Sequence, residues 1–172
     1  MQHNISTSNI DQQPTQSPVM SATIRPATPD DLPALKTLMD AVGLFPSDML
    51  DDMMADYFNQ TDSNHFWLTD DDDGLVGIAY YAPERLTDGT WNLYLIAIHP
   101  DRQGQGRGAA LLRYVEHQLR ERGERILLIE TSGVPDFEYQ RAFYRKCGYE
   151  EEARIRDFYQ AGDDKVIFRK AL

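Results

Sequence analysis

The chain has 172 residues, enough for one domain with a buried core, and its formal net charge at pH 7 is −11. This charge argues against a nucleic-acid-binding protein and favours a soluble one; a small cationic partner and a solvated acidic surface explain it equally well. A single cysteine excludes an internal disulfide and fits a reducing compartment. No apolar run approaches the roughly 18 residues of a membrane span. We therefore expect a cytoplasmic protein that binds neither nucleic acid nor membranes.

The first residues differ in composition from the rest of the chain. Residues 1–21 are rich in Ser, Gln, Asn and Thr and are nearly uncharged. They have neither the basic start nor the apolar centre of a signal peptide. We predict a flexible tail over residues 1–21 and one folded domain over residues 22–172.

The domain is expected to begin with a strand at residues 22–25 and a helix that starts after Thr28, with Pro29 in its first turn. A second helix follows the turn at residues 45–47. Its methionine-rich apolar stripe predicts core packing rather than a cofactor role.

Two strands, at residues 65–68 and 75–81, flank a turn that contains four consecutive aspartates. Calcium loops need alternating ligands, a central glycine and a distal glutamate, and the turn lacks this pattern. We therefore predict a hairpin with a solvated acidic turn.

The most informative stretch is residues 91–112, WNLYLIAIHPDRQGQGRGAALL. Its apolar run at residues 93–98 is typical of a strand covered on both faces. Three glycines then precede an amphipathic helix: Gly104, Gly106 and Gly108. Glycine lets the backbone approach an anion closely, and the N–H groups at a helix N-terminus point toward it. This order of elements predicts a pyrophosphate site.

One ligand for such a loop is a dinucleotide. Gly104-x-Gly106-x-x-Ala109 fits the dinucleotide fingerprint, and Glu130 stands where the ribose-binding acid would be. However, five residues separate the strand from the first glycine, and only about forty residues remain after Glu130 for a second set of βαβ units. The segment before the strand also reads as a hairpin. These three observations disfavour the dinucleotide, and a loop that merely turns the chain is the minor alternative.

The other ligand is coenzyme A. The pattern Gln103-x-x-Gly106-x-Gly108, after a strand and Pro100, resembles the coenzyme A site of the GCN5-related N-acetyltransferase (GNAT) superfamily. The signature of that superfamily is Arg or Gln, two residues, Gly, one residue, and Gly or Ala. We adopt this interpretation.

The remaining segments predict a strand at residues 126–129, a helix at 137–147 and a hairpin of strands at 151–159 and 165–169. The buried stripe expected for this last helix consists of Tyr139, Phe143 and Cys147, with Tyr144 one position round from it.

The expected order is strand, two helices, three strands, helix, strand, helix and two strands. It predicts an α/β (α+β) fold: a mixed, mostly antiparallel central sheet with helices on both faces. This order resembles the GNAT superfamily across residues 22–172. Residues 141–149, RAFYRKCGY, are also similar to the Tyr-Glu-Lys-x-Gly-Phe segment of that family. One position departs, because the asparagine often found seven residues before that tyrosine is Phe137 here.

The resemblance implies that acetyl-CoA is bound by the central strand and the glycine loop. The exposed edge of the strand would pair with the pantetheine arm and the thioester carbonyl, and the loop would hold the pyrophosphate. The residues implied are Ile96, Ala97, Ile98, Gln103, Gly104, Gln105, Gly106, Arg107, Gly108 and Ala109.

Acyl transfer needs a polarised carbonyl, an unprotonated amine and a leaving thiolate. By resemblance, Tyr144 is the general acid that protonates the thiolate; the alternative is a core tyrosine. Reference pKa values of about 10 for a phenol and about 8.5 for a thiol make that transfer uphill by roughly 2 kcal/mol, so we expect either a modestly lowered pKa of Tyr144 or proton transfer late in the reaction. Glu130 or Glu84 is the candidate base, acting through a water, and a structural salt bridge is the alternative for each. Phe45 lies where the fold places its acceptor loop and is expected to line the acceptor pocket.

The expected function is transfer of an acetyl group from acetyl-CoA to a primary amine of a small molecule or peptide, by direct attack in a ternary complex. The alternative is a non-catalytic acyl-CoA-binding or sensor module, and only Tyr144 separates the two. The histidines and the cysteine lack metal-ligand spacing, so we expect no metal. The acceptor stays open, and so does the choice between a monomer and a homodimer.

Overall fold

The chain is built around a seven-stranded sheet in the order β1-β2-β3-β4-β5-β7-β6. The computed structural model describes residues 23–172, and the tail predicted over residues 1–21 lies outside them. The strands are β1 (Ile24–Pro26), β2 (Phe66–Asp71), β3 (Leu75–Pro83), β4 (Thr90–Ile98), β5 (Ile126–Ser132), β6 (Glu150–Gln160) and β7 (Asp163–Ala171). The helices are α1 (Leu32–Val42), α2 (Met49–Asn59), α3 (Arg107–Glu121) and α4 (Glu138–Lys146), with short 3-10 turns η1 (Pro29–Asp31), η2 (Pro100–Arg102) and η3 (Pro135–Phe137).

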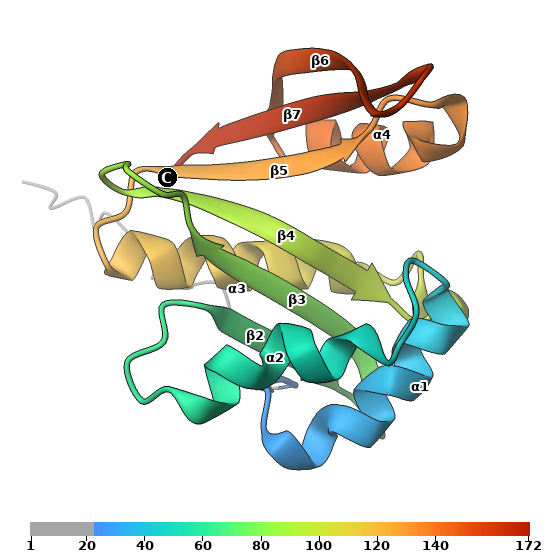
Figure 1. Cartoon of the computed structure of the whole chain (residues 1–172), viewed down its shortest axis with the longest axis vertical. Helices are drawn as coiled ribbons and strands as arrows, with labels where there is room; N and C mark the ends of the chain where they lie inside the picture. Colours follow the sequence, from blue (N-terminus) through green and yellow to red (C-terminus); the bar gives the residue numbers. More distant parts are fainter. Residues whose placement is uncertain (1–22) are drawn as a thin grey trace, which may run out of the picture.

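The sheet is mixed and mostly antiparallel. Strands β4 and β5 run parallel, and they are joined by α3 in a βαβ crossover (Figure 1). The other five strand pairs of the described chain are antiparallel. The predicted fold class and element order are therefore confirmed.

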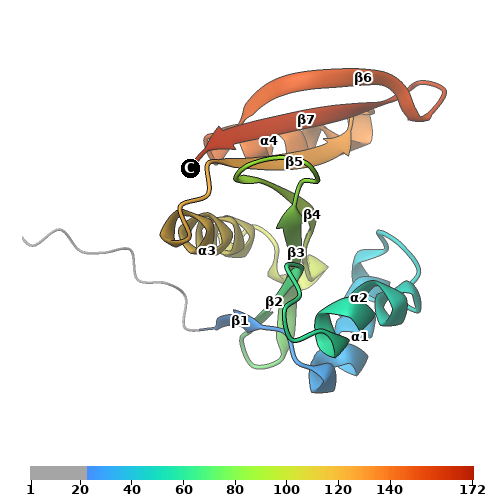
Figure 2. The same ribbon diagram turned by 60° about the vertical axis from the view of Figure 1, so that its left-hand side comes forward.

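Helices cover both faces of the sheet. Figure 2 shows α3 on one face and α1 with α2 on the other. The apolar stripe of α3 is fully buried against β4, β5 and β7: Leu111, Leu112, Val115 and Leu119. On the opposite face, α1 and α2 bury Leu35, Leu38, Met39, Leu50 and Met54 against β2, β3 and β4. The methionine-rich stripe of α2 is thus core, as predicted.

The acidic turn between β2 and β3 differs from its prediction. Asp70 is only 1% exposed, and its carboxylate accepts a hydrogen bond from Arg107. Asp72 accepts from both Arg102 and Arg107. The prediction of a solvated turn was therefore wrong for Asp70, because Arg107 at the start of α3 lies against it. Asp72 stays partly exposed, but it is paired with Arg102 of η2 and with Arg107.

The predicted buried stripe of α4 was also wrong. The residues of α4 that the core buries are Arg141 and Tyr144, whereas Tyr139 is 72% exposed. Phe143 and Cys147 are partly buried. Instead of facing the sheet, the predicted stripe faces an open cavity, described below.

None of the helices in residues 23–172 is both long enough and apolar enough to cross a membrane.

Candidate active site

The cavity arises because β4 and β5 separate halfway along their length. Their parallel pairing runs from Thr90 with Ile126 to Leu93 with Ile129. Beyond that point β5 stays paired with β7, and β4 stays paired with β3 (Figure 1). Within residues 23–172, no strand pairs with the β5-facing edge of β4 after Leu93. Backbone N–H and C=O groups on this edge are therefore available to a ligand.

A bulge marks the point of separation. Tyr81 pairs with Leu93 and Tyr80 with Leu95, so Tyr94 is an extra residue in β4. Such a bulge bends the strand and changes the direction of the side chains beyond it. Here it leaves Tyr94 half exposed at the mouth of the gap.

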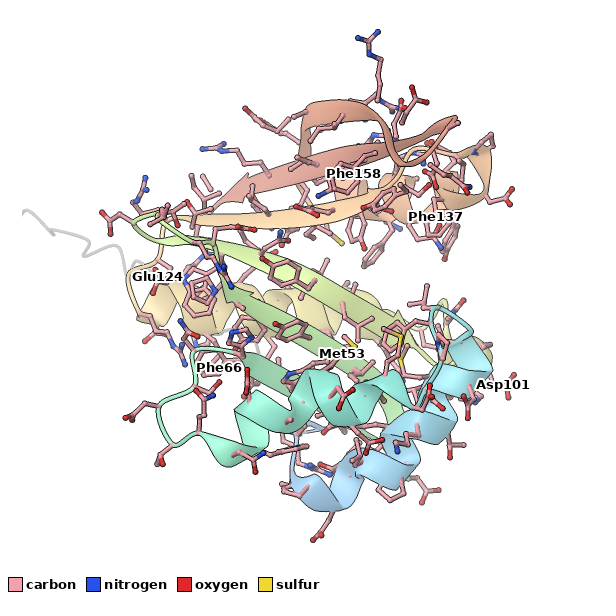
Figure 3. The ribbon with its side chains drawn as sticks, in the orientation of Figure 1. Met53, Phe66, Asp101, Glu124, Phe137 and Phe158 are labelled. Carbon is pink, nitrogen blue, oxygen red and sulfur yellow. The ribbon has the colours of Figure 1, made fainter. Side chains whose placement is uncertain are left out.

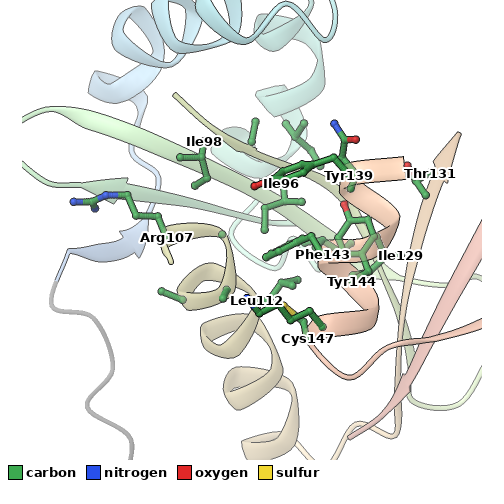
Figure 4. Close-up of a pocket in the computed structure, with 18 of the residues that line it drawn as sticks. Ile96, Ile98, Arg107, Leu112, Ile129, Thr131, Tyr139, Phe143, Tyr144 and Cys147 are labelled. Atoms are coloured by element: carbon green, nitrogen blue, oxygen red, sulfur yellow. The ribbon is translucent and has the colours of Figure 1, made fainter. Parts of the chain in front are cut away.

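The gap is a cavity of about 1260 Å³. Its walls come mainly from β4, the glycine loop, α3, β5 and α4. Figure 4 shows Phe143 and Tyr144 of α4, and Cys147 directly after it, facing Leu112 of α3 and Ile96 of β4 across the cavity.

One end of the cavity is shaped to hold an anion. Gly104 (φ +72°) and Gly106 (φ +79°) adopt the left-handed conformation that glycine tolerates best, and Gly106 is the N-cap of α3. The N–H groups in the first turn of a helix have no intrahelical partner. At Gly108, a Cβ would lie 3.2 Å from the ring of Phe143, so glycine lets α3 and α4 approach closely. The Gln103 side-chain amide donates to the carbonyl of Ile98 (3.1 Å), which ties the loop to β4.

The residues present fit a coenzyme A thioester. Beside the loop, exposed basic side chains line the outer end of the cavity although the whole chain is acidic: Arg113, His117 and Lys146. The middle is apolar, with Ile96, Leu112 and Phe143. Gln140 also lines the cavity, and its buried Oε1 has no hydrogen-bond partner in the described chain, which leaves an acceptor for a ligand N–H.

Tyr144 lies at the inner end of the cavity, packed between the rings of Phe143 and Phe168. Within residues 23–172 its hydroxyl has no hydrogen-bond partner. Burial, with a smaller contribution from Cys147, raises the pKa of Tyr144 to about 12. The expected lowered pKa was therefore wrong, since desolvation of the phenolate outweighs any nearby cation. The phenol is a proton donor at every physiological pH.

The two candidate bases, Glu84 and Glu130, both accept hydrogen bonds from a residue that was not predicted from the sequence, Asn92. The side-chain amide of Asn92, fully buried in β4, donates to Glu84 (2.8 Å) and to Glu130 (3.1 Å). Tyr94 also donates to Glu84 (3.0 Å), and Lys165 forms an ion pair with Glu130 (2.7 Å). The sequence did contain one indication of this role: Asn92 is a polar residue in the apolar strand β4, and a buried amide needs hydrogen-bond partners.

Most of the predicted coenzyme residues line this cavity. Those that do are Ile96, Ala97, Ile98, Gln103, Gly104, Gly106, Arg107, Gly108 and Ala109. Gln105 is exposed on the loop and is not part of the wall. Of the candidate bases, Glu130 lines the cavity, whereas Glu84 lies behind Asn92 and Tyr94.

Two other predicted positions have different surroundings from those expected. Phe45 packs, partly buried, against the core under α1 and α2, and its neighbour Leu44 lines the cavity instead. Phe137, at the position of the missing asparagine, contributes an aromatic ring to the wall beside α4 (Figure 3). In the described part of the chain, no three His, Cys, Asp or Glu side chains gather closely enough to hold a metal ion.

Comparisons with known proteins agree with this geometry. Residues 62–151 match the family model described as an acetyltransferase (GNAT) domain. A protein from Desulfovibrio desulfuricans, assigned to the GNAT acetyltransferases, is 34% identical; the match covers 86% of this chain and 97% of that one, with a TM-score of 0.79. No curated protein sequence gives a significant match.

Two more distant structures share the fold. The ribosomal-protein-S18-alanine N-acetyltransferase of Escherichia coli is 23% identical, with 87% of this chain and 92% of that chain covered and a TM-score of 0.69. An aminoglycoside 6′-N-acetyltransferase complexed with coenzyme A is 17% identical, with 86% and 96% covered and a TM-score of 0.68. The family model spans more than half of the 172 residues. The relative with 34% identity, the separated central strands and the glycine loop at the start of α3 point to the same family. The chain belongs to the GNAT family of acetyltransferases.

Proposed function

We propose that this protein transfers an acetyl group from acetyl-CoA to a primary amine by direct attack in a ternary complex. The observation that carries the proposal is one continuous cavity that joins the anion-binding N-terminus of α3 to Tyr144 and Glu130. A cavity of this kind holds donor and acceptor together. The thiol on its wall, Cys147, is a weak nucleophile because burial raises its pKa, which favours direct attack over an acetyl-enzyme intermediate.

The coenzyme is held mainly by backbone. The N–H groups from Gln105 to Ala109 bind the pyrophosphate, with Gln103 fixing the entrance to the loop. The free edge of β4 from Ile96 to Ile98 binds the pantetheine arm. When bound, acetyl-CoA supplies an activated acetyl thioester near Tyr144.

Two side chains transfer the protons, one as a base and the other as an acid. The Glu130 carboxylate, through a water, accepts a proton from the acceptor ammonium, and the free amine then attacks the acetyl carbon. A C–N bond forms, the nitrogen loses its extra proton to solvent, the C–S bond breaks and the electron pair leaves on sulfur. The Tyr144 hydroxyl donates its hydrogen bond and then its proton to that sulfur, and solvent restores Tyr144 and Glu130 to their starting states.

The raised pKa of Tyr144 limits how this proton moves. Transfer from a phenol of pKa about 12 to a free thiolate of pKa about 8.5 is uphill by roughly 5 kcal/mol. Tyr144 therefore acts first as a hydrogen-bond donor while charge develops on sulfur, and its proton follows only as solvent replaces it.

The acceptor end of the cavity favours a cationic amine. Glu130 and Asp163 line it with the half-exposed rings of Tyr94 and Tyr159. Carboxylates attract an ammonium group, and aromatic faces bind it by cation–π contact. The two distant relatives act on an alanine amine of a ribosomal protein and on an aminoglycoside, both of which fit this chemistry.

The test is acceptor-dependent release of the coenzyme A thiol in a panel of polyamines, amino acids, aminoglycosides and short peptides. Transfer to at least one amine is expected, with much lower transfer by Tyr144→Phe. Tight acetyl-CoA binding without transfer to any amine would favour the sensor module. Thermal unfolding gives an independent check: acetyl-CoA should raise the melting temperature, whereas NAD should not, because only a ligand of the folded state stabilises it.

A further inference from the structure

The glycine loop between η2 and α3 has few packing contacts of its own. Apart from the residues adjacent in the chain, no heavy atom of the described residues lies within 4 Å of the position a Cβ would take at Gly104 or Gly106. A glycine-rich backbone without packing samples many conformations, and fixing it on binding costs entropy. Something other than packing must therefore hold the loop in its anion-binding shape.

Side chains at the two ends of the loop provide the restraint. Arg102, at the end of η2, and Arg107, at the start of α3, both donate to the carboxylate of Asp72. One carboxylate of the β2–β3 turn thus joins the residues on either side of the glycines.

A second, deeper contact fixes Arg107. Its Nη1 donates to Oδ2 of Asp70 (3.0 Å), and the Asp70 side chain is 2% exposed. Thr23 donates to the other oxygen of the same carboxylate (2.5 Å). Both oxygens of Asp70 are thus engaged, so the position of the Arg107 guanidinium is well determined. Figure 4 shows the Arg107 side chain extending away from Phe143 and Tyr144.

The part of the β2–β3 hairpin to which the loop is attached is tightly packed. Gly77 of β3 pairs with Asp70, and a Cβ at Gly77 would lie 2.9 Å from Ile98 Cδ1 and 3.2 Å from Leu111 Cδ1. The hairpin, β4 and α3 therefore meet without spare space at this point. A loop attached here is attached to a rigid part of the fold.

We propose that Asp70 and Asp72 are positioning residues for the coenzyme, which hold the glycine loop in its pyrophosphate-binding shape through Arg107 and Arg102. The carboxylates neutralise both guanidinium groups, so the loop offers its N–H groups to the anion. A loop ordered before binding loses less entropy when the ligand arrives. This inference rests on the proposed function, because the ligand in question is acetyl-CoA.

The test compares two acetyl donors on Asp70→Asn. Acetyl-CoA carries the pyrophosphate, and S-acetyl-pantetheine lacks it. Loss of a charge-assisted contact that orders the loop should raise the KM for acetyl-CoA by about tenfold or more, with kcat unchanged. The kcat/KM for S-acetyl-pantetheine should stay within about twofold, since nothing in that donor contacts the loop.

The neighbouring aspartate provides a matched control. Asp71 pairs with Arg25, which lies outside the loop, so Asp71→Asn should leave both donors unaffected. Arg107→Lys keeps the charge but not the two-pronged geometry, and its KM for acetyl-CoA should fall between those of the wild type and Asp70→Asn. If circular dichroism shows that Asp70→Asn does not fold, Asp72→Asn at the more exposed end of the network should still raise that KM several-fold.

Two results would overturn the inference. One is a KM for acetyl-CoA in folded Asp70→Asn equal to that of the wild type. The other is an equal loss with both donors, which would mean general damage to the fold. An unmodified protein that uses neither donor would instead remove the proposed function itself, so the two failures are distinguishable.

Discussion

The two ends of the cavity are built in different ways. The anion end is mainly backbone: glycines at Gly104 and Gly106 with positive φ, followed by the free N–H groups of α3. The acceptor end is made of side chains from separate strands, with Asn92 on β4 joining Glu84 and Glu130. A backbone site needs particular residues at fixed spacing, whereas a side-chain site can draw on any residue that the fold brings near.

The ends also differ in charge. Arg113 and Lys146 line the end proposed for the coenzyme, whereas Glu130 and Asp163 line the end proposed for the acceptor. Under the proposed function, this polarity favours phosphate at one end and an ammonium group at the other, although Lys165 offsets part of the Glu130 charge. Variants can therefore separate coenzyme binding from transfer.

The largest effect is expected at the junction of the two ends. Tyr144→Phe removes the proton donor and keeps the ring, so kcat should fall by about 100-fold or more, the scale of a positioned acid. Coenzyme A affinity measured by calorimetry should barely change. Tyr149→Phe is the matched control: Tyr149 does not line the cavity and its buried hydroxyl donates to Glu116 (3.0 Å), so its loss should leave kcat unchanged. Near-normal turnover of Tyr144→Phe would mean that Tyr144 is a core residue and not the proton donor.

A second variant isolates the acceptor end. Glu130→Gln should lower kcat by about tenfold or more through loss of the base, with coenzyme A affinity unchanged. Glu84→Gln should have a smaller effect on kcat, because Glu84 lies behind Asn92 and Tyr94. Steady-state kinetics with the best acceptor of the panel measures both. The reverse ranking would make Glu84 the base and leave Glu130 as the partner of Lys165.

A third variant isolates the coenzyme end. Gly106→Val forces a branched side chain into a left-handed conformation and distorts the anion site, so coenzyme A affinity should fall by about tenfold. Gly123 has nearly the same φ (+77°) and open surroundings at the far end of α3, so Gly123→Val carries similar strain away from the ligand. Calorimetry should show weaker binding only for Gly106→Val. Equal affinities in the two folded variants would contradict the assignment of the loop.

The contrast between backbone and side chains also explains what the sequence could predict. Periodicity and the glycine spacing were sufficient for the fold, the element order and the loop at the start of α3. Asn92 was missed because one polar residue in an apolar strand has no motif. Asp70 was read as solvated because its partner, Arg107, is 37 residues away. Tyr139 was predicted as buried because helical spacing identifies a stripe but not whether that stripe faces a sheet or a cavity.

The smallest expected effect concerns pH, and it follows from the burial of Tyr144. Its pKa of about 12 lies above the ordinary value near 10, so the phenol stays protonated throughout the assay range. The ratio of wild-type kcat to that of Tyr144→Phe should therefore vary by less than about twofold between pH 7 and 10. A ratio that halves by pH 10 would mean a pKa near 10 and a more solvated hydroxyl.

The raised pKa of Tyr144 also predicts how the free energy of unfolding depends on pH above 10. The folded-state pKa is raised above the unfolded value, so its contribution to stability is fully present below about pH 10 and is lost as pH rises toward 12. Over that window the free energy of unfolding, measured by urea titration, should fall more steeply for the wild type than for Tyr144→Phe, which has no proton to lose. Equal slopes would mean that the hydroxyl is no harder to ionise in the folded protein than in water, and the case for a protonated donor at the inner end of the cavity would fail with it.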